Sequence, residues 1–494
     1  MKKLLTVSLA LAILTSPILS CADNANSNEQ ATTSGGNSGS TQSADSTSET
    51  DSVVKDSLPD NLDFGGAVIN MHVRNDVDSA YEFLAEGENA DIVNDIIYRR
   101  NELVQERLNV KLNVILGEDW TNYTQALSTI RNSINAGDNS YQLIAGWSTF
   151  IPTLAVEGYL ADLLKLPHLN LSERWWNKSI TDELTIDGKL NFAVGDANLS
   201  ALASAQVIFA NKNVQQDYAI PDLYQVVFDG GWTFDYMSEL LRSVYKDING
   251  NGKSDAEDLF GSAFNPWGTV DAFMQSSDIR MTKKDEEGMP YLDIEYERLS
   301  ALIDKVYNLL FQNEGVYYDG DNSKAGEMFV NDQLLLKSSI LIEATTDYRE
   351  METDFGILPY PKFDRAQEKY YTRIQDGLSL LCVPMNCDMP EAVGAFMEAT
   401  ASESYKSVTS VFFDTAMKVK YARDETSSKM LDIIREGEYV NFASVYNNSI
   451  GSPWWVMRDL MYAKSNDFAS WYDKNSPKIE AGIEKVVNKI KEID

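Results

Sequence analysis

Two hydrophobic periods alternate along the first part of the chain that is predicted to fold. Residues 67–73 place apolar side chains at every second position, which is the period of a β-strand. Residues 91–108 carry an apolar stripe at helical spacing, and residues 110–114 return to strand alternation. A second helix is predicted over 121–136, and residues 143–145 form a short apolar run typical of a buried strand. Strands that alternate with helices predict an α/β fold with a parallel sheet.

The ends of these predicted strands are candidate ligand positions. In parallel sheets covered by helices, ligands bind beyond the carboxyl ends of the strands. Arg74 and Asp76 follow the first predicted strand, and Trp147 follows the third. We therefore expect these three side chains to face a ligand.

The same order of elements recurs later in the chain. Residues 190–194 predict a strand that leads to Asp196, and residues 207–210 predict another. Further helices are expected to begin near Trp232 and to cover residues 296–312, 391–402 and 479–493. The chain shows no repeat of short period, which argues against solenoids and propellers. A second α/β region is therefore predicted.

The first residues predict export from the cell. Lys2 and Lys3 precede a mainly apolar stretch that is shorter than the ~20 residues of a membrane-spanning helix, so residues 1–20 are predicted to be a secretory signal peptide. Cys21 follows a small residue, as in a bacterial lipobox. This resemblance implies that Cys21 is acylated and anchors the protein to the bacterial cell membrane. An ordinary signal peptide cut elsewhere is the alternative.

Residues 21–57 are predicted to be a disordered tether. They are rich in Ser, Thr, Asn, Gly and acidic residues and contain no aromatic residue. Such a segment cannot bury enough apolar surface to offset the entropy cost of ordering. The folded part is therefore expected to begin near residue 58.

Charge and cysteine content narrow the class of protein. The formal charge is −33, and loss of Lys2 and Lys3 with the signal peptide brings it to −35. This acidity argues against binding to nucleic acid or to an anionic membrane surface, and it suits a soluble extracytoplasmic domain, expected to be monomeric. Beside Cys21 only Cys382 and Cys387 occur, so no disulfide framework is expected. Two free thiols are favoured over a local bridge.

Residues 247–258 match the pattern of a twelve-residue calcium loop. Oxygen-bearing side chains stand at positions 1, 3, 5, 9 and 12, glycine stands at position 6, and position 7 offers a backbone carbonyl. These candidate ligands are Asp247, Asn249, Asn251, Lys253, Asp255 and Asp258. We expect a weakly bound structural Ca²⁺, with a plain solvated turn as the alternative.

Catalytic motifs are absent, and aromatic residues are more informative. The sequence has no phosphate-binding glycine loop, no Gly-x-Ser-x-Gly motif and no His-Glu-x-x-His motif, and its two histidines are expected to be structural. A glycosidase carboxylate pair would be set by spatial distance and stays open. Of nine tryptophans, Trp175, Trp176 and Trp232 are assigned to the core, whereas Trp147 is a candidate for stacking on a sugar ring.

Several segments together resemble the extracellular solute-binding proteins of bacterial ABC sugar importers (family 1, similar to maltodextrin-binding proteins). They are residues 94–101, 107–110, 157–163, 231–233, 354–362, 366–367 and 370–371. The resemblance implies a two-lobed periplasmic-binding-protein-like fold with a hinge of two or three crossovers. It divides the chain into lobe one (58–165 with 325–386) and lobe two (166–324 with 387–494).

The resemblance also implies further cleft residues and a function. Beside Arg74, Asp76 and Trp147, the implied ligand contacts are Asp196, Trp267, Asp271, Glu343, Trp454 and Trp455. The implied function is capture of an oligosaccharide between the lobes and its delivery to an ABC permease, without catalysis. A secreted carbohydrate-active enzyme, a surface adhesion or scaffold protein, and a receptor for peptides or other polar solutes are the alternatives.

Overall fold

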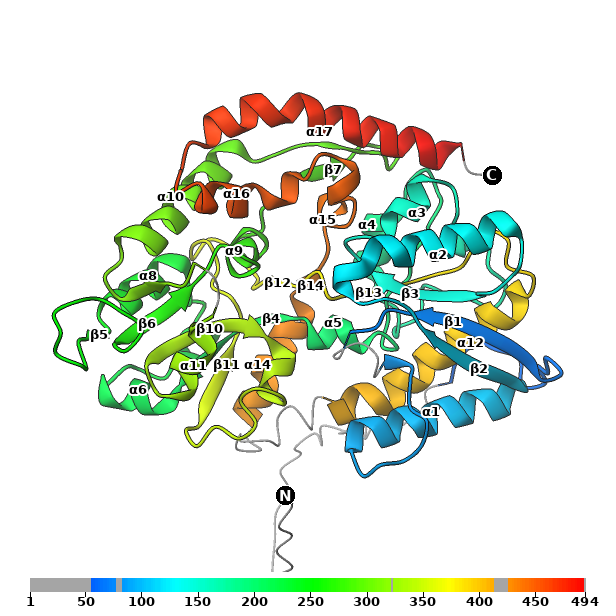
Figure 1. Ribbon diagram of the computed structural model, residues 1–494, viewed down its shortest axis with the longest axis horizontal. Helices are drawn as coiled ribbons and strands as arrows, with labels where there is room; N and C mark the ends of the chain where they lie inside the picture. The colour runs from blue at the N-terminus through cyan, green and yellow to red at the C-terminus, as the bar shows by residue number, and fades with distance from the viewer. Residues whose placement is uncertain (1–54, 77–81, 321–322, 413–424, 493–494) are drawn as a thin grey trace, which may run out of the picture. The chain divides into compact units, whose positions relative to one another are not determined.

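Two β-sheets form the framework of the chain (Figure 1). The computed structural model describes residues 55–76, 82–320, 323–412 and 425–492. The predicted signal peptide, Cys21 and most of the predicted tether lie outside the described residues. Asp56, expected in the tether, is buried and pairs with Arg107 at 2.6 Å. The folded part therefore includes residues slightly before 58.

The first sheet has the strand order β13-β3-β1-β2. The parallel strands β1 (Ala67–Val73), β2 (Val110–Leu116) and β3 (Leu143–Trp147) confirm the predicted pattern, and β13 (Ser379–Cys382) pairs with β3 in the antiparallel direction. The helices of this lobe are α1 (Ile92–Leu108), α2 (Tyr123–Ala136), α3 (Pro152–Val156), α4 (Lys178–Leu184) and α12 (Pro390–Glu403). Gly137 ends α2 in the left-handed conformation (φ 64°), as its position predicts.

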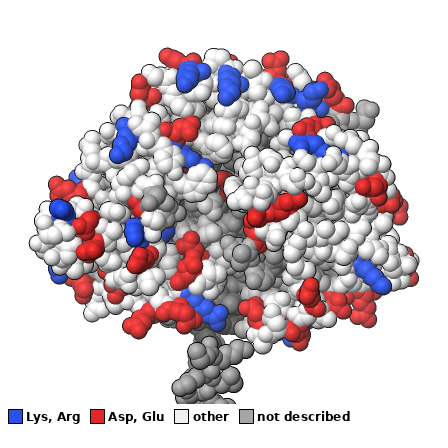
Figure 2. Space-filling model, viewed as in Figure 1, with Lys and Arg blue, Asp and Glu red and all other residues white. Residues whose placement is uncertain are grey.

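The second sheet is mixed, in the order β11-β4-β10-β6-β5 with β9 beside β6. Its strands are β4 (Gln206–Asn211), β5 (Tyr245–Lys246), β6 (Leu259–Phe264), β9 (Val316–Tyr318), β10 (Leu334–Ile340) and β11 (Phe355–Leu358). The helices around it are α6 (Lys212–Asp217), α7 (Leu223–Phe228), α8 (Phe234–Arg242), α9 (Thr269–Ser276), α10 (Tyr296–Gln312), α11 (Ala325–Val330) and α14 (Glu425–Glu436). Figure 2 shows acidic side chains spread over both halves of the visible face.

Strand pairing corrects the predicted division between the lobes. Residues 325–386 were assigned to lobe one, but β10 and β11 pair with β4 in the second sheet, so only β13 of that range joins the first sheet. Residues 387–494 were assigned to lobe two, but α12 packs against α1 and β1. The sequence pattern identifies strands, whereas sheet membership depends on pairing between distant segments.

Crossovers connect the lobes. The chain passes from the first sheet to the second through α5 (Leu199–Ala203), and it returns between β12 (Thr372–Arg373) and β13. Helix α12 packs in the first lobe and α14 packs against β11 in the second, and residues 413–424 lie outside the described part. Residues 190–194, predicted as a strand, form an extended segment in which Ala193 makes an isolated bridge with Leu381.

C-terminal elements pack against both lobes. They are β14 (Glu438–Tyr439), α15 (Phe442–Val445), α16 (Val456–Tyr462) and α17 (Phe468–Lys491), near the hairpin of β7 (Thr282–Lys284) and β8 (Pro290–Leu292). Helix α17 extends beyond its predicted 479–493 at the N-terminal side, and it contacts both α10 and α3 (Figure 1). Lys189 of the first lobe donates to the carbonyls of Ile490 and Lys491 at its end.

Candidate solute-binding site

A cavity of about 540 Å³ is lined by residues of both lobes and of the crossovers. The first lobe contributes the segments that follow β1 and β2, and the second contributes the β6–α9 loop, the end of β10 and helix α16. The lining residues are Arg74, Asp76, Trp120, Ser200, Ala203, Ser204, Trp267, Gly268, Ile340, Ile342, Gln375, Asp376, Gly377 and Arg458. The cavity thus lies beyond the carboxyl ends of β1, β2, β6 and β10.

An arginine–carboxylate pair forms the first-lobe side of the cavity. Arg74 lies 3.3 Å from Asp76, donates to Ser379 Oγ at 2.9 Å, and also donates to the carbonyl of Gly377. The indole Nε1 of Trp147 donates to Asp76 Oδ2. Arg74 is buried, whereas the Asp76 side chain is 27% exposed. Asp76 is therefore the acceptor that this lobe presents to a ligand.

Trp147 supports this pair from behind and does not line the cavity. It is 3% exposed, so its ring has no free face for stacking. Trp120, in the short 3₁₀ turn Trp120–Asn122, lies edge-on to Trp147 with ring centroids 6.1 Å apart and lines the cavity. Trp147, which was expected to face a ligand, is therefore a buried residue, and Trp120 is the first-lobe tryptophan that lines the cavity.

A second arginine–carboxylate pair forms the opposite side. Arg458 of α16 donates through Nε to Asp271 Oδ2 at 3.1 Å, and Asp271 is fully buried in α9. The guanidinium lies over the rings of Trp267 and Trp455, 4.4 and 5.3 Å from their centroids. Burial by itself would lower the pKa of Arg458, but the carboxylates of Asp271 and Asp376 outweigh it and raise that pKa. Arg458 is therefore a fixed cation on an aromatic platform.

Asp376 links this second pair to the crossover between β12 and β13. Its Oδ1 accepts from Arg373 Nη2 at 2.7 Å, and its Oδ2 lies 3.9 Å from Arg458 Nη2. Arg373 in turn donates to Gln206 at 3.0 Å. The Asp376 side chain is 23% exposed and lines the cavity.

Only three of the predicted contacts line this cavity: Arg74, Asp76 and Trp267. Asp271 pairs with Arg458, and Trp455 lies under the Arg458 guanidinium, but neither lines the cavity. Trp454 is buried. The prediction that these three side chains line the ligand cavity is therefore corrected. Trp175, Trp176 and Trp232 are buried as predicted: the first two donate to Glu398, and Trp232 donates to the carbonyl of Pro359.

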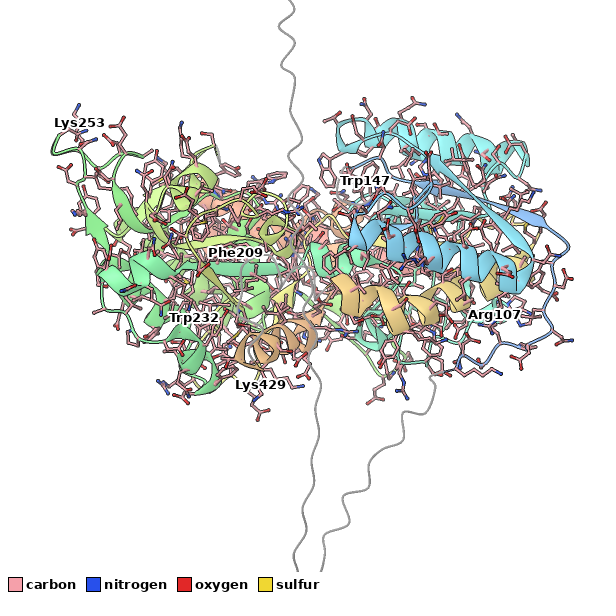
Figure 3. All side chains as sticks on the ribbon, turned by 90° about the horizontal axis from the view of Figure 1, so that it is seen from below. Arg107, Trp147, Phe209, Trp232, Lys253 and Lys429 are labelled. Atoms are coloured by element: carbon pink, nitrogen blue, oxygen red, sulfur yellow. The ribbon has the colours of Figure 1, made fainter. Side chains whose placement is uncertain are left out.

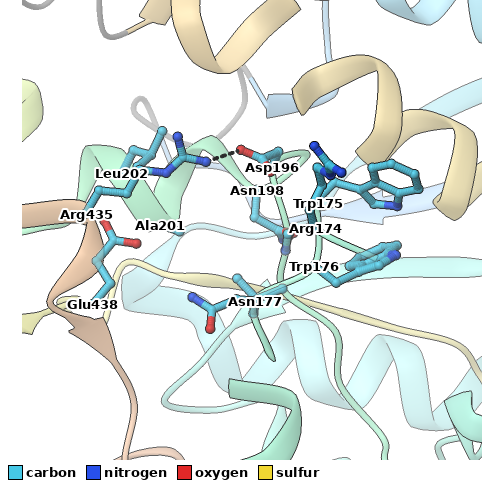
Figure 4. Close-up of a pocket in the computed structure, with 12 residues that line it drawn as sticks. Arg174, Trp175, Trp176, Asn177, Asp196, Asn198, Ala201, Leu202, Arg435 and Glu438 are labelled. Atoms are coloured by element: carbon cyan, nitrogen blue, oxygen red, sulfur yellow. Dashed lines mark hydrogen bonds and ion pairs between the residues drawn. The ribbon is translucent and has the colours of Figure 1, made fainter. Parts of the chain in front are cut away.

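Asp196 lies in a different, smaller cavity of about 190 Å³ (Figure 4). It accepts from Thr409 at 2.8 Å and from Arg435 at 3.0 Å. Glu438 lines the same cavity, and burial raises its pKa to about 8. Ala201 and Leu202 of α5 face this cavity, whereas Ser200 and Ala203 face the larger one, so α5 separates the two. Asp196 is therefore a residue of the hinge and not of the larger cavity.

Glu343 also lies outside the larger cavity. It lines a separate pocket with Lys337 and Asp347, and it accepts from the hydroxyl of Tyr348 at 2.7 Å. Its neighbour Ile342 lines the larger cavity. The short 3₁₀ turn Leu341–Ala344 follows β10 and directs the carboxylate of Glu343 into this separate pocket.

Sequence reasoning missed the residues that complete the site. Trp120 follows the predicted strand at 110–114, so the rule that selected Arg74 and Trp147 would have found it as well. No local sequence pattern marks Arg458, Gln375 or Asp376 as ligand-facing. No strand pattern precedes Arg458. The crossover that contains Gln375 and Asp376 is too short to show a hydrophobic period. Cys382 and Cys387 are both free thiols, as favoured.

The candidate calcium loop folds as a series of tight turns at the far edge of the second lobe (Figure 3, near Lys253). Asp247 accepts from the backbone N–H groups of Gly250 and Gly252, both of which have positive φ. Asp258 is buried and accepts from the N–H of Ile248. Within the described residues, no three His, Cys, Asp or Glu side chains converge as a metal site. A Ca²⁺ ion in this loop would therefore need amide and backbone oxygens as its remaining ligands.

Two lobes, the crossovers between them and a cavity between two sheet edges are typical of two-lobed solute receptors. A family model for bacterial extracellular solute-binding proteins matches residues 105–409, and the chain belongs to this family. It is therefore a receptor of ABC transport and not an enzyme. None of the helices in the described part of the chain combines the length and apolar character needed to cross a bilayer.

Solved structures share this fold at low sequence identity. A sugar transporter protein from Rhizobium etli in an open conformation matches with a TM-score of 0.57 and 16% identity, over 87% of this chain and 100% of that chain. An ABC substrate-binding protein from Listeria monocytogenes in complex with cycloalternan gives 0.51 and 12%, over 87% and 100%. The maltose/maltodextrin-binding domain from Bdellovibrio bacteriovorus bound to maltotriose gives 0.50 and 13%, over 86% and 99%. Comparison with curated proteins gives no match.

Proposed function

We propose that this receptor binds an oligosaccharide in the cavity between its lobes. The observation that carries the proposal is that Trp120 and Trp267, one from each lobe, line the same cavity as the carboxylates Asp76 and Asp376. An indole offers a flat apolar face to the C–H side of a pyranose ring, while carboxylates accept hydrogen bonds from its hydroxyls. A cavity with both groups suits a ligand that is apolar on its ring faces and polar at its edges.

The similar structures and the hinge support delivery to a permease. Two of the similar proteins carry oligosaccharides, cycloalternan and maltotriose, in their structures. A ligand that contacts Trp120 and Trp267 together interacts better with closed lobes, and it therefore shifts the population toward the closed state. The membrane permease of an ABC transporter would then recognise the closed receptor.

A thermal-shift screen followed by calorimetric titration tests this proposal. The secreted chain carrying Cys21→Ser is melted with maltotriose, maltotetraose, cycloalternan, monosaccharides and short peptides. A ligand at about 100 times its Kd should add about 2.7 kcal/mol of stability. If peptides stabilise the protein and none of the sugars does, the ligand is a polar solute other than an oligosaccharide.

We further propose that Cys21 carries a lipid that holds the receptor at the cell membrane. The support is the lipobox-like sequence before Cys21. Wild type should fractionate with membranes, whereas Cys21→Ser should be released into the medium. Equal membrane retention of both forms would contradict an anchor at this residue.

Calcium binding to residues 247–258 is a separate proposal. The spacing of oxygen-bearing side chains supports it, as does the turn around Asp247, whose two oxygens accept from the backbone N–H groups of Gly250 and Gly252. Asp247, Asn249, Asn251, Asp255 and Asp258 would hold the ion with the carbonyl of Lys253, and the ion would stabilise the second lobe.

A further inference from the structure

The gap between Asp376 and Arg458 has the geometry of a site for one additional oxygen atom. Asp376 Oδ2 and Arg458 Nη2 lie 3.9 Å apart, whereas a direct charge-assisted hydrogen bond spans about 2.7–2.9 Å. Two atoms at this separation can both lie within hydrogen-bond distance of a single oxygen. Among the described residues, none donates a hydrogen bond to Asp376 Oδ2. The cavity therefore offers an acceptor and a donor side by side.

The chemistry of this gap restricts the group that can fill it. A hydroxyl can donate to Asp376 and accept from Arg458 at the same time. A ligand carboxylate would only accept, and it would face the negative charge of Asp376. A ligand ammonium would only donate, and it would face Arg458. A neutral hydroxyl is the group that satisfies both residues.

Asp376 and Arg458, on the two sides of the gap, belong to different parts of the molecule. Arg458 is fixed in the second lobe by Asp271, with its guanidinium over the ring of Trp267. Asp376 belongs to the crossover, whose main chain is held by the first lobe. Arg74 donates to the carbonyl of Gly377, and the backbone N–H of Ser148 donates to the carbonyl of Leu378 at 2.9 Å. A hydroxyl in the gap would join the second lobe to a segment that the first lobe holds.

Resting on the proposed function, we propose that Asp376 is the residue that determines selectivity for a neutral hydroxyl ligand and couples its binding to the hinge. Asp76 provides the comparison, since it lines the same cavity but pairs directly with Arg74 at 3.3 Å within one lobe. Asp76 should contribute affinity without contributing to the hinge.

The first measurement is ligand discrimination by Asp376→Asn. The neutral oligosaccharide that binds best in the maltotriose, maltotetraose and cycloalternan series is compared with its derivative in which one primary hydroxyl is oxidised to a carboxylate. Loss of a charged hydrogen-bond partner should weaken the neutral ligand about ten- to a hundredfold. The preference for the neutral over the carboxylate form should fall by about tenfold or more, because the repelling charge is gone. Asp376→Glu keeps the charge and should keep rejecting the carboxylate form.

The second measurement is the distance between the lobes without ligand. Spin labels are placed on cysteines introduced at Glu102 in α1 and Glu239 in α8, both exposed, in a Cys21→Ser, Cys387→Ser background. Asp376→Asn should broaden or shift the distance distribution, because the crossover loses its charged contact with the second lobe. Asp76→Asn should leave the distribution unchanged, and Asp432→Asn, an exposed control on α14, should change neither distance nor affinity.

The outcomes separate the two proposals. A wild type that binds none of the oligosaccharides overturns the proposed function, and the role of Asp376 with it. A wild type that binds, together with an Asp376→Asn variant of wild-type affinity and discrimination, overturns the role of Asp376 alone. An unchanged distance distribution in Asp376→Asn overturns the coupling to the hinge. The melting temperature of each variant is measured first, and Asp376→Ser, which also removes the carboxylate, takes the place of an Asp376→Asn variant that does not fold.

Discussion

The two sides of the cavity use the same pair of residue types in different ways. In the first lobe Arg74 is buried and its partner Asp76 is 27% exposed, so the carboxylate faces the ligand. In the second lobe Asp271 is 0% exposed and does not line the cavity, whereas its partner Arg458 does. The first lobe therefore lines the cavity with both members of its pair, and the second lobe with the arginine alone.

This difference shows how a cleft can hold charged side chains without a charged ligand. Each arginine is neutralised within its own lobe, so neither needs a ligand carboxylate for compensation. The buried carboxylate Asp271 carries a larger structural role than Asp76, because an isolated charge in the interior is far more costly than one near water. The two pairs should therefore respond differently to the same substitution.

The largest expected effect is the difference in the free energy of unfolding between Asp271→Asn and Asp76→Asn. Asp271→Asn leaves Arg458 without its buried counter-ion and should reduce the free energy of unfolding by about 3–5 kcal/mol. Asp76→Asn should reduce it by less, because the Asp76 carboxylate is partly in water and Arg74 keeps its hydrogen bonds to Ser379 and to the carbonyl of Gly377. Denaturant unfolding of both variants measures this difference. Similar midpoints for the two would show that the pairs are structurally equivalent.

Tryptophan substitutions extend the comparison to the aromatic residues. Trp147→Ala should destabilise the fold by about 3–5 kcal/mol, since it empties a buried site behind Asp76. Trp267 is 47% exposed, so Trp267→Ala should leave stability nearly unchanged and weaken ligand binding by about 1–1.5 kcal/mol, or about tenfold in Kd. Thermal melting and calorimetric titration distinguish the two effects. Full ligand affinity in Trp267→Ala would remove it from the binding surface.

Acid should destabilise the first lobe through His72 in β1. Burial lowers the pKa of His72 to about 4, below the 6.5 of an unfolded histidine, and both ring nitrogens lack a partner among the described residues. The unfolded chain then binds the proton more readily between pH 6.5 and 4. Stability from this group is fully present above pH 6.5 and is lost as pH falls toward 4, by about 3 kcal/mol in total.

His72→Gln should reduce this acid sensitivity, and the half-buried His168 offers the matched control. Urea unfolding at pH 7.5, 6, 5 and 4 measures the slope of stability against pH for wild type, His72→Gln and His168→Gln. The same slope in all three proteins would assign the acid sensitivity to other groups.

Calcium should produce the smallest effect, confined to the second lobe. At ten times its Kd, a bound ion adds about 1.4 kcal/mol of stability. Removal of calcium with a chelator should therefore lower the melting temperature of wild type, whereas Asp247→Ala should show no response to chelator. A wild-type melting curve that is insensitive to chelator would leave residues 247–258 as a plain turn.

Local sequence patterns predicted most elements of the fold. The alternation at residues 67–73 and the helical stripes at 91–108 and 296–312 correspond to β1, α1 and α10. Arg74 and Asp76 were found for the same reason, since two residues directly after a strand are placed by that strand. The segment at 190–194 is extended but forms no strand, because it pairs with β13 only at the isolated bridge between Ala193 and Leu381.

The sequence by itself determined most of the elements, the resemblance to solute-binding proteins and the Arg74–Asp76 pair, because strand periods and the spacing of these two residues are local. Only the tertiary structure decided which sheet receives β10 and β11, and which side chains surround Arg458. Asp271 and Arg458 are 187 residues apart, and Asp376 meets them through a crossover. Such contacts depend on how separate segments pack around a common core, and no period or spacing within one segment records that arrangement.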